Sequence, residues 1–256
     1  MTGKYYSVNV PIVEKGNGEA AYADADLLFD WVSFQIPRGA AKLTTISLVM
    51  LGTNGADGNN HDIELFFAKS INGEAPPSLG TVNGATTQAR ATKARRHMIG
   101  FKLVDTSTMK DDEDLLAYNV LSTSKDASEM NGLILQGDSV PYRNTTDNNS
   151  TVFEAGTQTI FLAGIAKGAL DFRSTVQVST ETATNTTAVV VKTTSALINF
   201  APGDTLHDED DLVIGTVKSV TDATNIVLTE NCASVSAVNK DLYNIHPIQF
   251  MISSED

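Results

Sequence analysis

Four consecutive acidic residues form the densest group of side chains in this sequence that could bind a metal or move protons. Asp208, Glu209, Asp210 and Asp211 stand in the run "PGDTLHDEDDLVIGTV". In an extended chain, alternate side chains would point in opposite directions, whereas a metal site needs ligands that converge from spaced positions. The pattern therefore predicts a solvated turn that feeds two strands and discourages edge-to-edge pairing.

Two looser acidic groups resemble parts of calcium-binding loops. The first lies in "DGNNHD" and lacks the glutamate that closes such a loop. The residues of the two groups are Asp57, Asn59 and Asp62 in the first, and Asp24, Asp26 and Asp30 in the second. Clusters of Asn, Asp and Gly are more often ordinary turns. We expect turns at both places, with calcium binding as the alternative.

Other signatures of catalysis or cofactor binding are weak. Gly16, Gly18 and Ala21 match a dinucleotide-binding fingerprint, but hairpin patterns follow them in place of the alternating strands and helices which that fingerprint requires. The sequence has no nucleophile elbow, zinc-binding helix or P-loop, and its histidines are scattered at His61, His97, His207 and His246. We therefore predict no catalytic residue, no metal and no cofactor. A depolymerase that uses paired carboxylates ranks last among the hypotheses.

One segment is basic although the chain as a whole carries a net charge of −13. The run "RATKARRH" contains Arg90, Lys93, Arg95 and Arg96 directly before an apolar strand pattern. It is either a solvated hairpin arm or a docking contact for an acidic protein surface, because interfaces favour Arg and opposite charges steer association. The acidic total and the lack of interleaved aromatic residues argue against nucleic acid.

Alternation of apolar and polar residues with a period of two dominates the chain and predicts half-buried antiparallel strands. It is clear in "WVSFQIP", "DIELFFAKS" and "HMIGFKLV", the last with Ile99, Phe101 and Leu103 on one side. Asn-Gly pairs beside such runs predict tight hairpins; they begin at Asn54, Asn72, Asn83 and Asn131. Two turns of helix are expected in "TMKDDEDLLAYNVL", with Thr108 as the cap.

Composition changes after "GIAKGALDFRS". Residues 174–256 carry three basic and eleven acidic residues and are rich in Thr, Ser and Val. Their expected strands are short and include "DLYNIHPIQFMI" at the end of the chain, with a bulge at Gly215. The predicted fold is all-β: an antiparallel, jelly-roll-like β-sandwich domain over 1–172, followed by a small acidic β-barrel domain over 173–256.

The remaining composition bears on the cellular compartment. A single cysteine, Cys232, excludes a disulfide within one chain. The first residues lack the pattern of a signal peptide, and no apolar run is long enough to span a bilayer. We therefore expect a soluble protein that is made in a cytoplasm and has no membrane partner.

The order of these segments, with "GALDF" before "APGDTL" and "GTVKSVTDATNIVLTEN", resembles virion structural proteins of tailed bacteriophages, particularly marine ones. It is most similar to head decoration, or capsid cement, proteins. The resemblance implies a non-enzymatic protein that forms trimers or other symmetric clusters on the major capsid protein at the virion surface. The alternative is a tail or fibre module that binds a host surface glycan or receptor, with Trp31, Tyr118 and Tyr142 as stacking faces.

Overall fold

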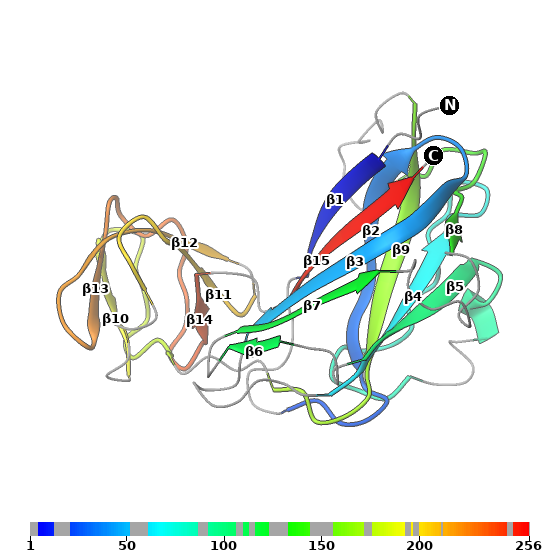
Figure 1. Ribbon diagram of the computed structural model, residues 1–256. Coiled ribbons are helices and arrows are strands. Elements are labelled where there is room, and N and C mark those ends of the chain that lie inside the picture. The colour runs from blue at the N-terminus through cyan, green and yellow to red at the C-terminus, as the bar shows by residue number, and fades with distance from the viewer. Residues whose placement is uncertain are drawn as a thin grey trace.

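The protein is nearly all β-structure, arranged in three antiparallel sheets (Figure 1). This agrees with the predicted fold class at the level of secondary structure. The computed structural model describes residues 5–12, 21–51, 61–86, 92–105, 110–112, 116–122, 133–143, 156–171, 176–192, 196, 200–210, 212–244 and 248–255.

The first sheet has six strands and combines the two ends of the chain. Its order is β1-β15-β3-β7-β6, and β8 also pairs with β3. The strands are β1 (Tyr5–Ile12), β15 (Ile248–Glu255), β3 (Ala41–Leu51), β7 (Leu116–Ser122), β6 (Lys110–Asp112) and β8 (Ile134–Leu135). The last strand of the chain therefore lies between two strands from its first fifth.

The second sheet has four strands in the order β2-β9-β4-β5. They are β2 (Leu27–Pro37), β9 (Thr157–Ala166), β4 (Ile63–Lys69) and β5 (Met98–Val104). Phe34 and Ile36 on β2 are buried, as are Ile63, Leu65 and Phe67 on β4, so the alternation seen in the sequence is confirmed on these two strands.

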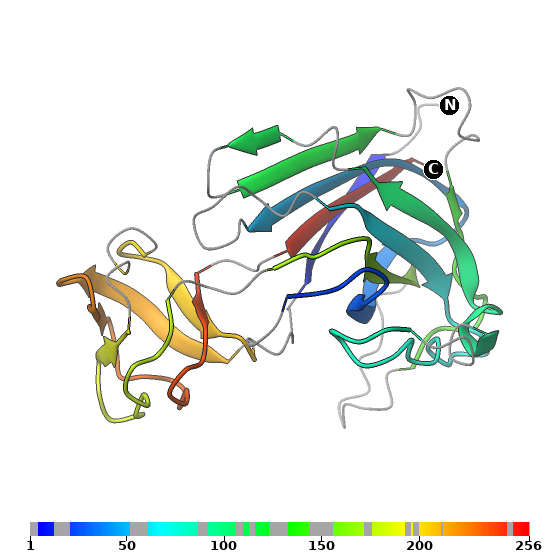
Figure 2. The same cartoon turned by 90° about the horizontal axis from the view of Figure 1, so that it is seen from below.

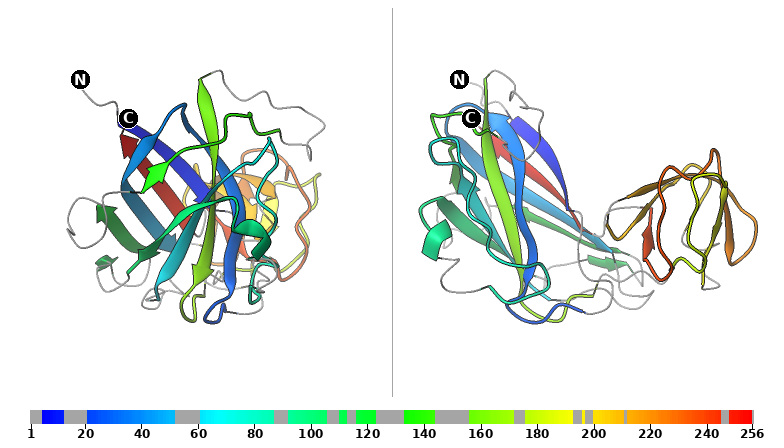
Figure 3. Two further views of the ribbon diagram at one scale, coloured as in Figure 1. Left: turned by 90° about the vertical axis from the view of Figure 1, so that its right-hand side faces the viewer. Right: turned by 180° about the vertical axis from the view of Figure 1, so that it is seen from behind.

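The first and second sheets share one hydrophobic core. Phe29 of β2 and Phe250 of β15 meet across it, with ring centroids 5.7 Å apart. Contributors from the first sheet include Leu43, Ile46 and Ile252, all at most 2% exposed. The views in Figures 2 and 3 show the two sheets facing one another over this core.

The third sheet is a strongly curled half-barrel with a core of its own. Its order is β10-β13-β12-β11-β14, in which the strands are β10 (Ala188–Val190), β13 (Asn225–Leu228), β12 (Val213–Val220), β11 (Thr205–Asp208) and β14 (Leu242–Tyr243). Two isolated bridges, Gln177 with Asp241 and Val178 with Val191, connect the two edges of this sheet, one beside β14 and the other beside β10. In the pairing of β11 with β12, Leu206 is opposite Gly215 but His207 is opposite Val213. The register therefore shifts by one residue beside Gly215, where the sequence predicted a bulge.

Two expectations about individual strands were wrong. The run "DLYNIHPIQFMI" is not one strand of the acidic segment: Leu242–Tyr243 belong to the half-barrel, whereas Ile248–Glu255 pair with β1 and β3. Buried Ile248, Phe250 and Ile252 complete the first core, which explains this position. The segment expected to be helical contains β6 and β7 instead, because pairing with β3 outweighs its modest helix propensity. Its proposed cap, Thr108, lies outside the described residues.

The hairpin expectation is confirmed at Asn72-Gly73, where Ile71 and Glu74 pair across the turn and the two central residues have φ angles of 55° and 82°. Asn83 also has a positive φ angle, 56°, but its turn pairs with the backbone of Leu27 and does not join two paired strands. Asn54 and Asn131 lie outside the described residues.

Gly164 on β9 provides a test of the shared core. A Cβ atom there would lie 2.3 Å from Cε1 of Phe29, whose ring is buried against Phe250 and has no room to move. We expect Gly164→Ala to lower the free energy of unfolding by roughly 2–3 kcal/mol, as overpacking does. Urea denaturation followed by the fluorescence of Trp31 measures this loss.

Gly84→Ala is the control for that substitution. Its Cβ would lie 3.3 Å from the backbone oxygen of Thr81, a contact that a shift of a few tenths of an ångström relieves. We expect a loss well below that of Gly164→Ala. Equal losses for the two variants would show that contact with Phe29 is not the cause.

Candidate docking surfaces and the acidic network

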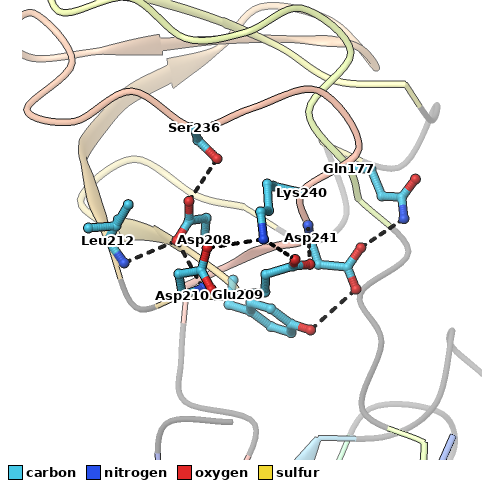
Figure 4. Close-up of polar contacts among 9 residues, drawn as sticks. Gln177, Asp208, Glu209, Asp210, Leu212, Ser236, Lys240 and Asp241 are labelled. Carbon is cyan, nitrogen blue, oxygen red and sulfur yellow. Dashed lines mark hydrogen bonds and ion pairs between the residues drawn. The ribbon is translucent and has the colours of Figure 1, made fainter. Parts of the chain in front are cut away.

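Asp208, the first of the four consecutive acids, is a buried structural residue at the end of β11. It is only 4% exposed. Its Oδ1 accepts hydrogen bonds from the backbone N–H groups of Asp210 and Leu212, at 3.0 and 3.1 Å, and its Oδ2 accepts one from the Ser236 hydroxyl at 2.9 Å. The carboxylate thus closes the turn between β11 and β12 and fastens the segment around Ser236 to it (Figure 4).

Glu209 and Asp210 hold Lys240 from the same turn. The Lys240 ammonium lies 2.5 Å from Oε1 of Glu209 and 3.0 Å from Oδ2 of Asp210. The hydrogen bond with Glu209 is the largest cause of a raised pKa for Lys240. Oε2 of Glu209 also accepts the backbone N–H of Asp241 at 3.2 Å. These contacts join the β11–β12 turn to the residues that precede β14.

Asp241 extends the network toward the start of the acidic segment. Its carboxylate accepts hydrogen bonds from the amide of Gln177 at 2.9 Å and from the hydroxyl of Tyr243 at 3.4 Å, and the residue is fully buried (Figure 4). The predicted turn between two strands is present, but its solvation was wrong for Asp208 and Glu209, because Ser236, Lys240 and the backbone of Asp241 replace water at their carboxylates. Asp211 lies outside the described residues.

Four exposed apolar side chains lie on the two segments that this network joins. Leu212, Val213, Val235 and Val238 are each 44–49% exposed. They come from the two segments that the Asp208 contacts bring together, and the backbone N–H of Ala233 also donates to the carbonyl of Ile214 at 2.8 Å. Asp210 has a side chain that is 54% exposed and lies 3.0 Å from the Lys240 ammonium, so its charge is already paired.

The basic segment lies in a short turn that begins with one turn of helix before β5. Lys93, Arg95 and Arg96 are exposed, whereas Ala94 between them is buried. The turn is tied to the end of β4, since the backbone N–H of Lys69 donates to the carbonyl of His97 at 2.9 Å. Arg90, the fourth predicted docking residue, lies outside the described residues.

The strand after this turn exposes two large apolar side chains. Phe101 is 60% exposed and Leu103 is 45% exposed. The expectation that Ile99 shares their side was wrong: the register shifts between Phe67 and Ala68, so Ile99 packs against the shared core while Phe101 and Leu103 face outward. A β-bulge has this effect, because one extra residue reverses the alternation.

Phe101 and the basic turn lie on the same side of the second sheet. Phe101 is opposite Phe66, with ring centroids 6.3 Å apart, and Phe66 is opposite Ala163. Residues opposite one another on neighbouring strands point to the same face. Ala163 clusters with Ala94, which lies inside the basic turn. We call the exposed residues of this face, Lys93, Arg95, Arg96, Phe101 and Leu103, the basic surface.

Two of the other acidic candidates, Asp26 and Asp30, accept hydrogen bonds from backbone N–H groups. Asp26 accepts the backbone N–H of Ala23 at 2.7 Å, and Asp30 accepts that of Leu79 at 3.1 Å. Within the described part of the chain, no three His, Cys, Asp or Glu side chains are grouped so as to hold a metal ion. Asp57, Asn59, Gly16 and Gly18 lie outside that part.

The aromatic residues considered for glycan stacking have partners within the protein. The indole N–H of Trp31 donates to the carbonyl of Pro77 at 3.0 Å, and its ring packs on the outer cluster of the second sheet. Tyr142 meets Phe161 edge-on at 5.1 Å. Tyr142 also lines a polar pocket together with Arg38, Ser70 and Asp138. The volume of this pocket, about 40 Å³, has room for only a few water-sized groups. The side chain of Tyr118 lies outside the described residues.

Comparison with known proteins adds no family assignment. A scan against protein-family models found no match, and a search of curated proteins found no similar sequence. In the described ranges, no helix is both long enough and apolar enough to cross a membrane.

Proposed function

We propose that this protein is a non-enzymatic structural component of a phage virion that decorates and stabilises the capsid by binding the major capsid protein. The observation that carries the proposal is that a chain with a net charge of −13 presents one exposed face of opposite charge, the basic surface, with Phe101 and Leu103 on it. A repeated component of a shell must contact several neighbours at once, and many weak contacts gain strength through effective concentration.

The charge of the chain supports binding to protein in preference to nucleic acid or membrane. Phosphates would be repelled by a net charge of −13. The exposed arginines of the basic surface stand beside Phe101, and Arg and aromatic residues are the types enriched in protein interfaces. An acidic patch on the capsid protein is the partner that this chemistry fits.

The finer architecture is part of the same proposal. We propose that the first two sheets form a jelly-roll-like sandwich domain and that the half-barrel forms a separate small domain. The two core clusters share no residue, which supports two independently packed units. The sandwich would then include β15 in addition to residues up to 172.

Cosedimentation with purified, expanded capsids tests the proposed function. We expect the wild-type chain to bind at many sites per particle, and Arg95→Glu with Arg96→Glu to lower the occupancy at least tenfold, because the reversed charges repel an acidic partner. Lys42→Glu, a charge reversal at an exposed position on β3, is the control and should bind as wild type does.

Two results would contradict this assignment. One is the absence of wild-type binding to capsids. The other is binding to host surface polysaccharide in a parallel glycan screen without capsid binding, which would place the protein among tail or fibre modules. Hydrolysis of that polysaccharide would identify a depolymerase instead.

A further inference from the structure

We propose that the polar pocket beside Tyr142 binds a pair of neighbouring hydroxyl groups, such as a saccharide or a small polyol carries. The pocket lies where the end of β2, the residue after β4, the residues up to Tyr142 and the start of β9 meet, and its lining includes Arg38, Ser70 and Asp138. The inference goes beyond the proposed function, because none of these residues belongs to the basic surface.

The walls of this pocket are held in place by hydrogen bonds between segments that are distant in the sequence. The side-chain amide of Gln158 donates to the carbonyl of Pro37 at 3.0 Å, and its Oε1 accepts the backbone N–H of Gly137 at 2.8 Å. The backbone N–H of Asn72 donates to the Asp138 carboxylate at 2.6 Å. The pocket is therefore formed before a ligand arrives, which lowers the entropy cost of binding.

Ser70 supplies a buried hydroxyl that the protein leaves available. The residue is 2% exposed and lines the pocket, and among the described residues its hydroxyl has no hydrogen-bond partner. Most buried polar groups are hydrogen-bonded, and a serine hydroxyl can donate one bond and accept two. Because protein encloses Ser70 on its other sides, the pocket is where a partner for this hydroxyl can lie.

Two opposite charges stand at the pocket without an ion pair between them. Within the described part of the chain, the Arg38 guanidinium has no hydrogen-bond or ion-pair partner, although Arg38 and Asp138 line the same pocket. Burial raises the pKa of Asp138, but backbone hydrogen bonds, first that of Asn72, outweigh this effect and hold the pKa below its usual value. The carboxylate repels an anion and the guanidinium repels a cation, so a neutral polar group fits best.

The remaining lining favours hydroxyl groups on a short carbon chain. A hydroxyl both donates and accepts, as the Ser70 hydroxyl does, and it is close in size to water, of which the pocket volume of about 40 Å³ holds only a few molecules. Val140, Pro141 and the ring of Tyr142 add apolar surface, on which the carbon atoms that carry the hydroxyls can pack. Two hydroxyls on adjacent carbons combine these properties.

Titration of the isotope-labelled full chain with glycerol, followed through backbone amide shifts, tests the site. We expect saturable shifts in residues 70–73 and 137–142, with a dissociation constant on the order of 1 mM, because so few contacting atoms provide only weak affinity. Acetate and acetamide are the comparison probes, one for an anion and one for a neutral group without hydroxyls. Neither should saturate this site.

Ser70→Ala is the decisive variant, because it separates binding from folding. In the free protein the hydroxyl has no partner to lose, so urea denaturation should show no loss of stability, whereas the dissociation constant for glycerol should rise about tenfold. Arg38→Gln should weaken binding by a similar factor. Ser254→Ala, at an equally buried serine of β15 that does not line the pocket, is the control and should bind as wild type does.

Host surface polysaccharide distinguishes the two sources of such hydroxyls. Shifts of the same residues with polysaccharide would identify a saccharide, and shifts with glycerol alone would identify a small polyol; both results support the inference. Three results would overturn it: no saturable shift with glycerol, which would leave the pocket to water, a saturable response to acetate or acetamide in place of glycerol, or undiminished binding by folded Ser70→Ala and Arg38→Gln.

These outcomes are separate from that of the proposed function, because cosedimentation with capsids tests the basic surface. A chain that binds capsids but no hydroxyl ligand would keep the proposed function and remove this site. A chain that binds glycerol but no capsid would keep the site and remove the capsid role.

Discussion

Removal of residues 248–256 is expected to abolish folding of the first two sheets. The deletion takes away β15, which is hydrogen-bonded to β1 on one side and to β3 on the other. It also removes Ile248, Phe250 and Ile252, each at most 2% exposed, from the shared core. Far-UV circular dichroism and the fluorescence of Trp31 should show an unfolded first part. Native spectra for the shortened chain would contradict the central position of β15.

Phe250→Ala measures the same contribution in a chain that still folds. Its ring packs against Phe29, and truncation of a buried aromatic side chain to alanine costs about 3–5 kcal/mol. We expect a loss of that size in urea denaturation. Met251→Ala is the matched control, because Met251 neighbours Phe250 on β15, faces the other way and is 47% exposed. A loss for Met251→Ala as large as that for Phe250→Ala would refute this account.

The position of β15 also decides how the acidic segment should be studied. A deletion from residue 174 to the end of the chain would remove that segment together with β15, so loss of capsid binding would report unfolding of the first core. A variant that replaces 176–244 with a flexible linker retains β15 and separates the two effects.

Asp208→Ala is expected to lower the stability of the half-barrel by roughly 3 kcal/mol. The substitution leaves the hydroxyl of buried Ser236 without its acceptor, which costs about 1–3 kcal/mol, and it also removes the acceptor of the turn N–H groups of Asp210 and Leu212. Asp208→Asn should lose less, because its carbonyl oxygen still accepts the two N–H groups and its amide can donate to Ser236. Hydrogen exchange of peptides from 205–243 localises the change.

Asp222→Ala is the control for Asp208→Ala. Asp222 accepts bonds from Thr224 and Asn225 in a similar turn, but it is exposed, so water replaces the lost acceptor. The backbone N–H of Thr224 is the largest cause of its lowered pKa. We expect a much smaller loss of stability for this variant. Losses of equal size would mean that burial does not determine the contribution of Asp208.

Much of the architecture followed from local pattern. The alternation of Phe34 with Ile36, and of Ile63 with Leu65, predicts strands because side chains on a strand alternate between two faces whatever lies on either side. Asn72 and Asn83 predict tight turns because their tolerance of positive φ is a property of the residue and its neighbour. These features required no knowledge of which strands pair.

What the local pattern left open was decided by partners far away in the chain. Residues 248–255 alternate equally well for either core, and only pairing with β1 and β3 places them in the first sheet. Ile99 packs inward while Phe101 faces outward, because a bulge in the pairing with β4 lies between them. Asp208 is buried because Ser236, 28 residues later, supplies a donor that replaces water. Whether a side chain is buried, and to which face of a sheet it points, depend on the summed contacts of distant segments. Such contacts exist only once the chain has folded.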